Sequence, residues 1–260
     1  RFGVHVDDDR LAAVHHLHPG SRGNRPREDA PMLEPRATDD RGMEAIEEVH
    51  HVRDVHVTLF WAGLEGKEAV GMTVPANGLI ANAGKDKSRE YRVLKIDGKQ
   101  GKFLYDLSYG KQVAYADGTI ANAPDADYRD IQFGYDFGPV LVKIQQETLD
   151  QDFQTPLATL HAFNGWADRF LVTPTGGLVD TNIKLSGKAA GLGLSLAVHQ
   201  FDAESGGKTF GREIDASVTK TFTPNWSAMV KVAQYDGSGE DATAYTKDVV
   251  KAWAQVDYKF

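Results

Sequence analysis

The stretch Val250-Lys-Ala-Trp-Ala-Gln-Val-Asp-Tyr-Lys-Phe260, at the end of the chain, decides the fold. Its even-numbered positions, such as Val256 and Tyr258, are apolar, whereas its odd-numbered positions are mostly polar or charged. Because a β-strand places successive side chains on opposite faces, this period of two predicts a strand with one apolar and one polar face.

The same period recurs through the last two thirds of the chain. Further examples occur in residues 103–109, 131–137, 192–198, 209–222 and 226–235. We expect about nine such strands between residues 89 and 260, with a tenth near either 55–61 or 67–74. The segment 43–56 has weak helical character. The pattern as a whole predicts an all-β fold.

Short and long connections alternate between the expected strands. The short ones are expected at residues 97–100, 137–139, 187–190 and 223–225, and the longer ones at 117–126, 150–179, 202–208 and 237–246. This alternation is typical of an up-and-down barrel with tight turns at one rim and extended loops at the other. We therefore predict an antiparallel up-and-down transmembrane β-barrel, complete or partial, with the C-terminus at the short-turn rim.

Aromatic residues on the apolar face support a membrane location. They flank three of the four expected short turns and the C-terminus, at positions Phe103, Tyr105, Tyr135, Phe137, Phe222, Trp226, Tyr258 and Phe260. Membrane barrels carry such aromatic girdles where strands cross the interface. A soluble β-sandwich or a lipocalin-like barrel with scattered aromatics is the alternative, since its strands alternate in the same way.

Composition excludes several classes of protein. The 260 residues are 41% hydrophobic and 25% charged, and no apolar run is long enough for a transmembrane helix. The absence of cysteine excludes disulfide scaffolds, thiolate metal sites and a catalytic thiol. The formal net charge of -8 argues against nucleic acid as a partner, because phosphate contacts require clustered Lys and Arg.

The first part of the chain differs from the rest. We expect residues 1–50 to form an irregular or disordered segment and residues 51–260 to form the barrel domain. Seven of the nine histidines lie within the first 56 residues. No regular element there sets the geometry of a metal site, so we expect these histidines to be solvated and predict neither a metal nor a cofactor.

No enzyme signature is found, and we predict that the protein is not an enzyme. The sequence lacks a G-x-S-x-G elbow, a Walker loop and an H-E-x-x-H motif. Outer-membrane barrels can be lipid hydrolases that use a Ser–His pair, and Ser195 and His199 share a strand face. Four strand residues span about 13 Å, which is too far for a hydrogen bond between these two side chains.

The polar face of the strands is expected to line a water-filled lumen of mixed charge. The predicted pore-lining residues are Lys102, Asp106, Asp130, Asp136, Lys143, Glu147, Lys184, Glu213, Asp215, Lys231, Lys251 and Asp257. The 150–179 loop is too apolar to extend into water, so we expect it to fold inward or over the mouth as a constriction, or else to pack against neighbouring loops or a partner subunit. Its candidate residues are Phe153, His161, Phe163, Trp166, Asp168 and Phe170.

Two stretches resemble a known family. The terminal positions Val256, Tyr258 and Phe260 resemble the assembly signal of Gram-negative outer-membrane barrels. The stretch 153–170, with Thr173-Pro174 and Gly177-Leu178 after it, is similar to the long loop of alginate-export porins. The similarity covers about residues 90–260 and departs at the N-terminus, where the family has further strands, which favours a truncated barrel.

The resemblance implies a passive outer-membrane channel in a Gram-negative bacterium, without a cofactor. Its expected partners are outer-membrane lipid, the barrel-assembly machinery, and a small hydrophilic or polysaccharide solute. The mixed charge of the lumen favours a general solute over alginate itself. The alternative is a non-transporting binding or structural protein, either a soluble β-barrel or a membrane-anchored one.

Overall fold

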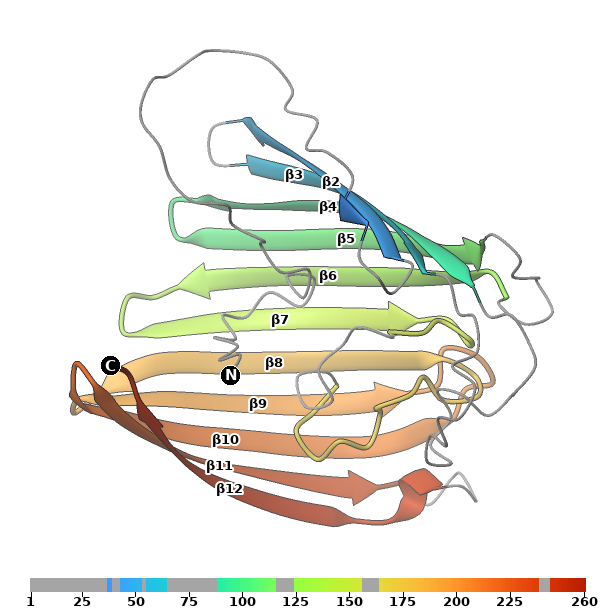
Figure 1. Cartoon of the computed structure of the whole chain (residues 1–260). Coiled ribbons are helices and arrows are strands. Elements are labelled where there is room, and N and C mark those ends of the chain that lie inside the picture. Colours follow the sequence, from blue (N-terminus) through green and yellow to red (C-terminus); the bar gives the residue numbers. More distant parts are fainter. Residues whose placement is uncertain are drawn as a thin grey trace, which may run out of the picture.

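The computed structural model describes residues 37–38, 43–52, 55–64, 88–115, 124–155, 164–238 and 244–260. These residues form a twelve-stranded sheet in which the strands follow one another in chain order (Figure 1). The first six strands are β1 (Ala37–Thr38), β2 (Met43–Val52), β3 (Val55–Leu64), β4 (Arg89–Gln100), β5 (Phe103–Ala114) and β6 (Ala126–Asp136). The remaining elements are β7 (Val140–Leu149), β8 (Leu178–Ala189), β9 (Leu192–Asp202), β10 (Thr209–Thr223), β11 (Trp226–Gly237), the 3₁₀ turn η1 (Ala244–Thr246) and β12 (Val249–Tyr258).

Every neighbouring pair of strands is antiparallel, which confirms the all-β, up-and-down prediction. The nine strands expected after residue 89 are β4 to β12, and the tenth is β3 at Val55–Leu64. The other candidate for it, 67–74, lies outside the described residues. Among the described residues no pairing joins β12 to β1, so the sheet is strongly curved but open (Figure 1).

Two local predictions are wrong. Residues 43–56 were expected to be weakly helical, but Met43–Val52 forms β2 and pairs along its whole length with β3. Cross-strand pairing overrides a weak local helix preference. Two turns also lie later than expected, at 101–102 and 190–191. Ala190 and Gly191 both have positive φ, 51° and 72°, as a two-residue hairpin turn requires.

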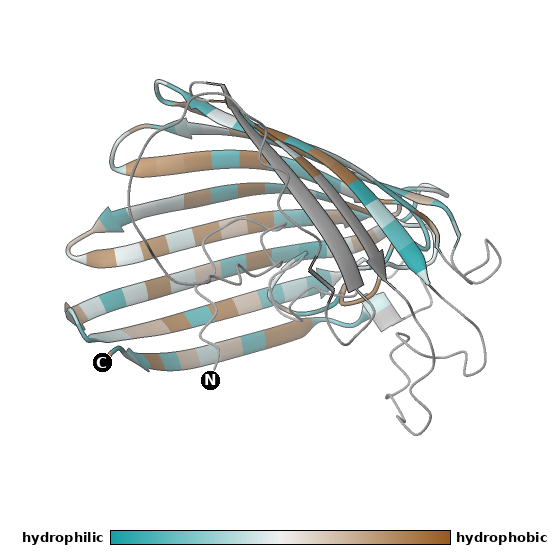
Figure 2. Ribbon diagram, turned by 45° about the horizontal axis from the view of Figure 1, so that its top comes forward, coloured by the Kyte–Doolittle hydropathy of each residue, from teal (hydrophilic) through white to brown (hydrophobic). Residues whose placement is uncertain are grey.

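Hydrophobic and hydrophilic residues alternate along the strands (Figure 2), so the two faces of the sheet differ in polarity, as the sequence predicts. The convex face carries exposed apolar side chains such as Ile144, Val230 and Val250, which are 54%, 55% and 74% exposed. The aromatic residues of the short-turn rim lie exposed on the same face: Phe103, Tyr135, Phe137, Phe222, Trp226, Tyr258 and Phe260. A soluble sheet protein would instead bury such a face in its core.

The buried residues lie on the concave face, toward the rim that carries the long loops. Along β10, the concave positions are buried from Gly211 to Asp215, half-exposed at Ser217 and Thr219, and exposed at Thr221. The packed cluster includes Phe153 and Phe170, which come from the loop between β7 and β8. In the described part of the chain no helix has the length and apolar character required to cross a membrane.

Candidate functional site

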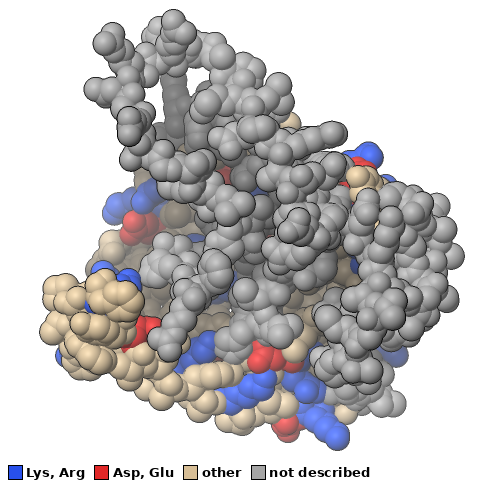
Figure 3. Space-filling model, in the orientation of Figure 1, with Lys and Arg blue, Asp and Glu red and all other residues tan. Residues whose placement is uncertain are grey.

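The concave face carries the charged side chains that the sequence predicts as a pore lining. On the first strands of this face, Nζ of Lys95 lies 3.0 Å from Oδ2 of Asp106. Lys102 lies exposed in the turn between β4 and β5. Asp136 ends β6 and accepts a hydrogen bond of 2.8 Å from the backbone N–H of Gly138. Figure 3 shows charged side chains of both signs on this side of the molecule.

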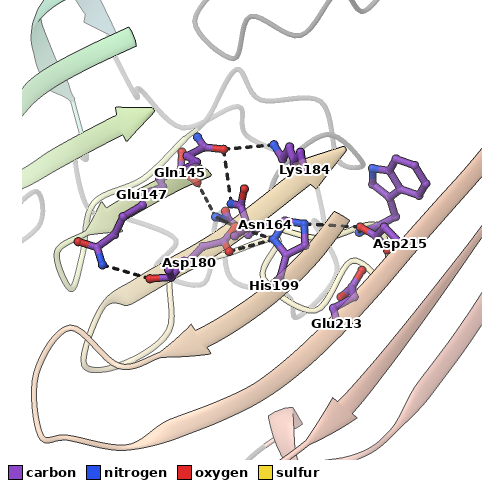
Figure 4. Close-up of polar contacts among 12 residues, drawn as sticks. Gln145, Glu147, Asn164, Asp180, Lys184, His199, Glu213 and Asp215 are labelled. Carbon is purple, nitrogen blue, oxygen red and sulfur yellow. Dashed lines mark hydrogen bonds and ion pairs between the residues drawn. The ribbon is translucent and has the colours of Figure 1, made fainter. Parts of the chain in front are cut away.

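A hydrogen-bonded network crosses β6, β7 and β8 (Figure 4). The side-chain amide of Gln145 donates to Asp130 at 2.8 Å, and its carbonyl accepts from Nζ of Lys184 at 3.2 Å. Tyr128 donates its hydroxyl to Glu147 at 3.1 Å. Asp130 and Glu147 are 7% and 3% exposed, and carboxylates buried to this extent require such partners.

His199 connects two buried carboxylates on the neighbouring strands. Its Nδ1 lies 2.9 Å from Asp180 of β8, and its Nε2 lies 3.8 Å from Asp215 of β10 (Figure 4). Ser195 lies on the same face of β9, but its Oγ is 2.7 Å from Oγ of Ser217. The two side chains that a Ser–His hydrolase would join therefore have different partners.

Residues 164–170 of the long loop lie against the concave face, and we call them the inserted segment. The backbone N–H of Trp166 donates to Oδ2 of Asp215 at 3.1 Å, and that of Ala167 donates to Oε1 of Glu213 at 2.7 Å. Glu213 and Asp215 are 0% and 1% exposed. Two consecutive N–H groups of the loop thus bind two carboxylates of the same strand.

Side chains on either side of these two N–H groups bind the inserted segment to other strands. The side-chain amide of Asn164 donates to Glu147 of β7 and lies 3.5 Å from Oδ2 of Asp180 on β8 (Figure 4). Asp168 accepts a hydrogen bond of 2.6 Å from Nζ of Lys251 on β12. The segment is therefore attached to strands from β7 to β12 by charge-assisted hydrogen bonds, which are the stronger kind.

Aromatic rings of the long loop fill the space beside these hydrogen bonds. The ring of Phe170 lies 4.5 Å from that of Phe201 and 5.1 Å from that of Tyr245, measured between centroids. Phe153, at the beginning of the loop, stacks on Tyr128 at 5.4 Å. Both loop phenylalanines are buried. The described parts of the loop thus pack on the concave face of the sheet, which we call the wall, and also against Tyr245 of the neighbouring loop between β11 and β12. These contacts include elements of both sequence-based alternatives.

Lys231 of β11 lies between two indole rings. Its Nζ is 5.0 Å from the ring centroid of Trp166 in the inserted segment and 4.8 Å from that of Trp253 in β12. A cation at this distance over an aromatic face is attracted by the ring quadrupole. This contact adds a further attachment of the inserted segment to the wall.

Toward the short-turn rim the concave face is more open. Lys143 of β7 lies opposite Lys184 there, and Asp257 of β12 accepts hydrogen bonds from Gln255 at 2.8 and 3.0 Å. A cavity of about 560 Å³ opens on this part of the face, and its lining includes Ser186, Lys188, Ser195, Ser217 and Thr219. Its polar groups are hydroxyls more often than carboxylates.

The structure thus places four of the six predicted loop residues at the wall: Phe153, Trp166, Asp168 and Phe170. The other two, His161 and Phe163, lie outside the described residues. Sequence reasoning missed the parts of Gln145, Asn164 and Asp180 in the network. The strand period could have found Gln145 and Asp180, because they share the concave face with Glu147 and Lys184.

No set of three or more His, Asp or Glu side chains within the described ranges is arranged to hold a metal ion. Neither a known family model nor a curated protein matches the sequence. The concave face is therefore a polar surface with two parts. The part covered by the loop is packed and carries charged groups, whereas the part near the short turns is open and carries mostly hydroxyl groups.

Proposed function

We propose that the protein is a passive outer-membrane channel of the alginate-export type, which moves a hydrophilic solute or a polysaccharide through a charged lumen. The observation that carries the proposal is the direction of the side chains. Large apolar residues are exposed on the convex face of strands β3 to β12, while buried carboxyl groups lie on the concave face: Asp130, Glu147, Asp180, Glu213 and Asp215. This arrangement suits hydrocarbon outside and water inside.

The energetics of the convex face support a membrane location. Apolar surface in water costs about 25 cal/mol per Å², and soluble monomers seldom expose apolar patches beyond a few hundred Å². The exposed apolar residues here continue from strand to strand across the sheet, including Ile131, Ile144, Ile183, Val198, Ile214 and Val232. A bilayer removes this cost without a protein partner.

The terminal residues support the same assignment. Val256, Tyr258 and Phe260 are 67%, 53% and 107% exposed, so a recognition factor has access to all three. Trp226 pairs with Tyr258, their rings 4.7 Å apart, at the short-turn end of β11 and β12. In the proposed orientation this rim faces the periplasm, where the barrel-assembly machinery binds its substrates.

One observation favours a second candidate, a membrane-anchored protein that transports nothing. The packed half of the concave face contains buried aromatic rings, such as Phe170, Phe201 and Tyr235, where a wide pore would contain water. In this alternative the strands anchor the chain in lipid, and the interior is filled rather than conducting. The soluble alternative leaves the exposed convex face unexplained.

A two-part measurement tests the proposal. The refolded chain is first centrifuged with and without detergent, and we expect it to remain monodisperse only with detergent. It is then added to planar bilayers, where we expect discrete conductance steps. Monodisperse protein in plain buffer would contradict any membrane location, whereas insertion without conductance would favour the anchored, non-transporting candidate.

A further inference from the structure

Two buried carboxylates occupy adjacent concave-face positions of β10. Glu213 and Asp215 are 0% and 1% exposed, in a sheet whose other face is apolar. Burying two like charges side by side is costly, because each loses its hydration and repels the other. Such a pair persists where fixed donors compensate it or where one of the two carboxyl groups keeps its proton. Here the donors are two backbone N–H groups of the inserted segment, and Nε2 of His199 lies 3.8 Å from Oδ2 of Asp215.

The backbone of the inserted segment is shaped to fit this pair. Gly165 has φ +86°, and a Cβ built on it would lie 2.5 to 2.7 Å from the carboxyl atoms of Glu213. Only glycine permits both this φ and this approach. Asn164 and Asp168 also have positive φ, 51° and 57°. Consecutive N–H groups in a backbone of this kind form a concavity that binds anions.

The other polar contacts of the segment leave the two backbone N–H groups at its centre to the carboxylates. Asn164 and Asp168 attach its two ends, to β7 and β12, through side chains. Between them, the two backbone N–H groups are bound by Glu213 and Asp215. These two hydrogen bonds hold the backbone of the segment close to β10 at this point.

We propose that Glu213 and Asp215 are positioning residues that hold the inserted segment at the wall and thereby set the width of the passage along the concave face. The inference rests on the proposed channel function. The segment lies over the concave face in front of β9 and β10 (Figure 1), so its position limits the cross-section open to a solute. A segment released from the carboxylates becomes mobile, and the time-averaged passage changes.

The test uses the full chain with both residues replaced. Glu213→Ala with Asp215→Ala removes both acceptors, whereas Glu213→Gln with Asp215→Asn keeps a side-chain carbonyl for each N–H. Thr221→Ala is the control, because Thr221 lies exposed on the same face of β10, near the short-turn rim and away from the loop. Hydrogen exchange at the amides of residues 166 and 167 is measured together with single-channel conductance and the unfolding temperature.

In the double alanine variant we expect the two amides to exchange about tenfold faster and the conductance to change by about twofold, with increased current noise. The variant with Glu213→Gln and Asp215→Asn and the control Thr221→Ala are expected to stay within error of the unmodified protein in both exchange and conductance. If the double alanine variant does not fold, the single variant Glu213→Ala is used instead, and exchange is measured at the amide of Ala167.

Unchanged exchange at both amides in a folded alanine variant would overturn the inference. A lowered unfolding temperature with unchanged conductance would also overturn it, since the carboxylates would then only stabilise the sheet. If the unmodified protein conducts nothing, the channel function fails. In that case the exchange measurement still decides whether the carboxylates hold the segment.

Discussion

The two halves of the concave face are built from the same strands but differ in what covers them. In the half near the long loops, the rings of Phe170, Phe201 and Tyr235 are buried together with the carboxylates of β10. In the half near the short turns, Ser195 and Ser217 bond to each other beside an open cavity. The core is therefore formed by strand residues together with the long loop that packs on them.

The difference in loop cover explains why one face of the sheet has both buried and accessible polar groups. Glu213 and Ser217 are four residues apart on β10, yet the first is fully buried and the second is half-exposed. The inserted segment covers only the first. Polar groups covered by the loop require hydrogen-bond partners within the protein, whereas polar groups in the open half can form hydrogen bonds with water.

The largest expected effect comes from removing a ring from the loop half. Phe170→Ala deletes the residue whose ring contacts Phe201, Phe210, Tyr235 and Tyr245. Truncation of a buried phenylalanine typically costs about 3–5 kcal/mol, because apolar contacts are lost and a cavity remains. We expect this loss in the free energy of unfolding, measured by urea titration in lipid vesicles.

The same titration applied to Ser217→Ala probes the open half. A hydroxyl pair at a hydrated site contributes about 0.5–1.5 kcal/mol, so the loss should be several times smaller. Equal losses for the two variants would mean that the halves do not differ in packing, and the comparison would be wrong.

The second-largest expected effect comes from placing an arginine on the convex face, compared with the open half of the concave face. Val230 is 55% exposed on the convex side of β11, near the middle of the apolar band, and Met229 beside it points to the concave side. An arginine facing lipid at the bilayer midplane costs about 2–4 kcal/mol. We therefore expect Val230→Arg to lower stability and folded yield in vesicles by that amount.

Met229→Arg is the matched control, one residue away on the same strand. It places the same charge next to water, where surface substitutions usually change stability by about 0.5 kcal/mol or less. If both variants assemble equally well, the convex face does not contact hydrocarbon, and the membrane location is contradicted.

The strands and their faces could be predicted from sequence because both follow from a local rule. A period of two fixes which side chains share a face, and this placed Val250 and Val256 on the exposed side of β12 correctly. The turns were less predictable. The glycine at 191 permits the positive φ that the β8–β9 hairpin needs, but several small residues precede it, and no local signal distinguishes among them.

The attachment of the loop could not be predicted, because it depends on contacts distant in sequence. Ala167 and Glu213 are 46 residues apart, and Trp166 and Asp215 are 49 apart. The sequence indicated that the loop is too apolar to stay in water, which was sufficient to expect inward packing as one outcome. It predicted Glu213 and Asp215 as pore-lining charges, whereas the structure places both beneath the inserted segment.

The smallest effect tests whether the loop half depends on close contact between backbone and carboxylate. Gly165→Ala introduces a side chain at φ +86°, where a Cβ would lie 2.5 Å from Oε2 of Glu213. Positive φ in a non-glycine residue costs about 1–3 kcal/mol, and the displaced carboxylate adds to that cost. We expect a loss near the upper end of this range, with faster amide exchange at Trp166 and Ala167.

Gly206→Ala separates the two contributions. Gly206 has nearly the same φ, +83°, but nothing lies within 4 Å of its Cβ position, so its substitution introduces the backbone strain alone. The difference between the two losses in the free energy of unfolding is the part due to Glu213. If the losses are equal, the approach of Gly165 to the carboxylate carries no energy, and the packed half is held by its aromatic rings rather than by its hydrogen bonds.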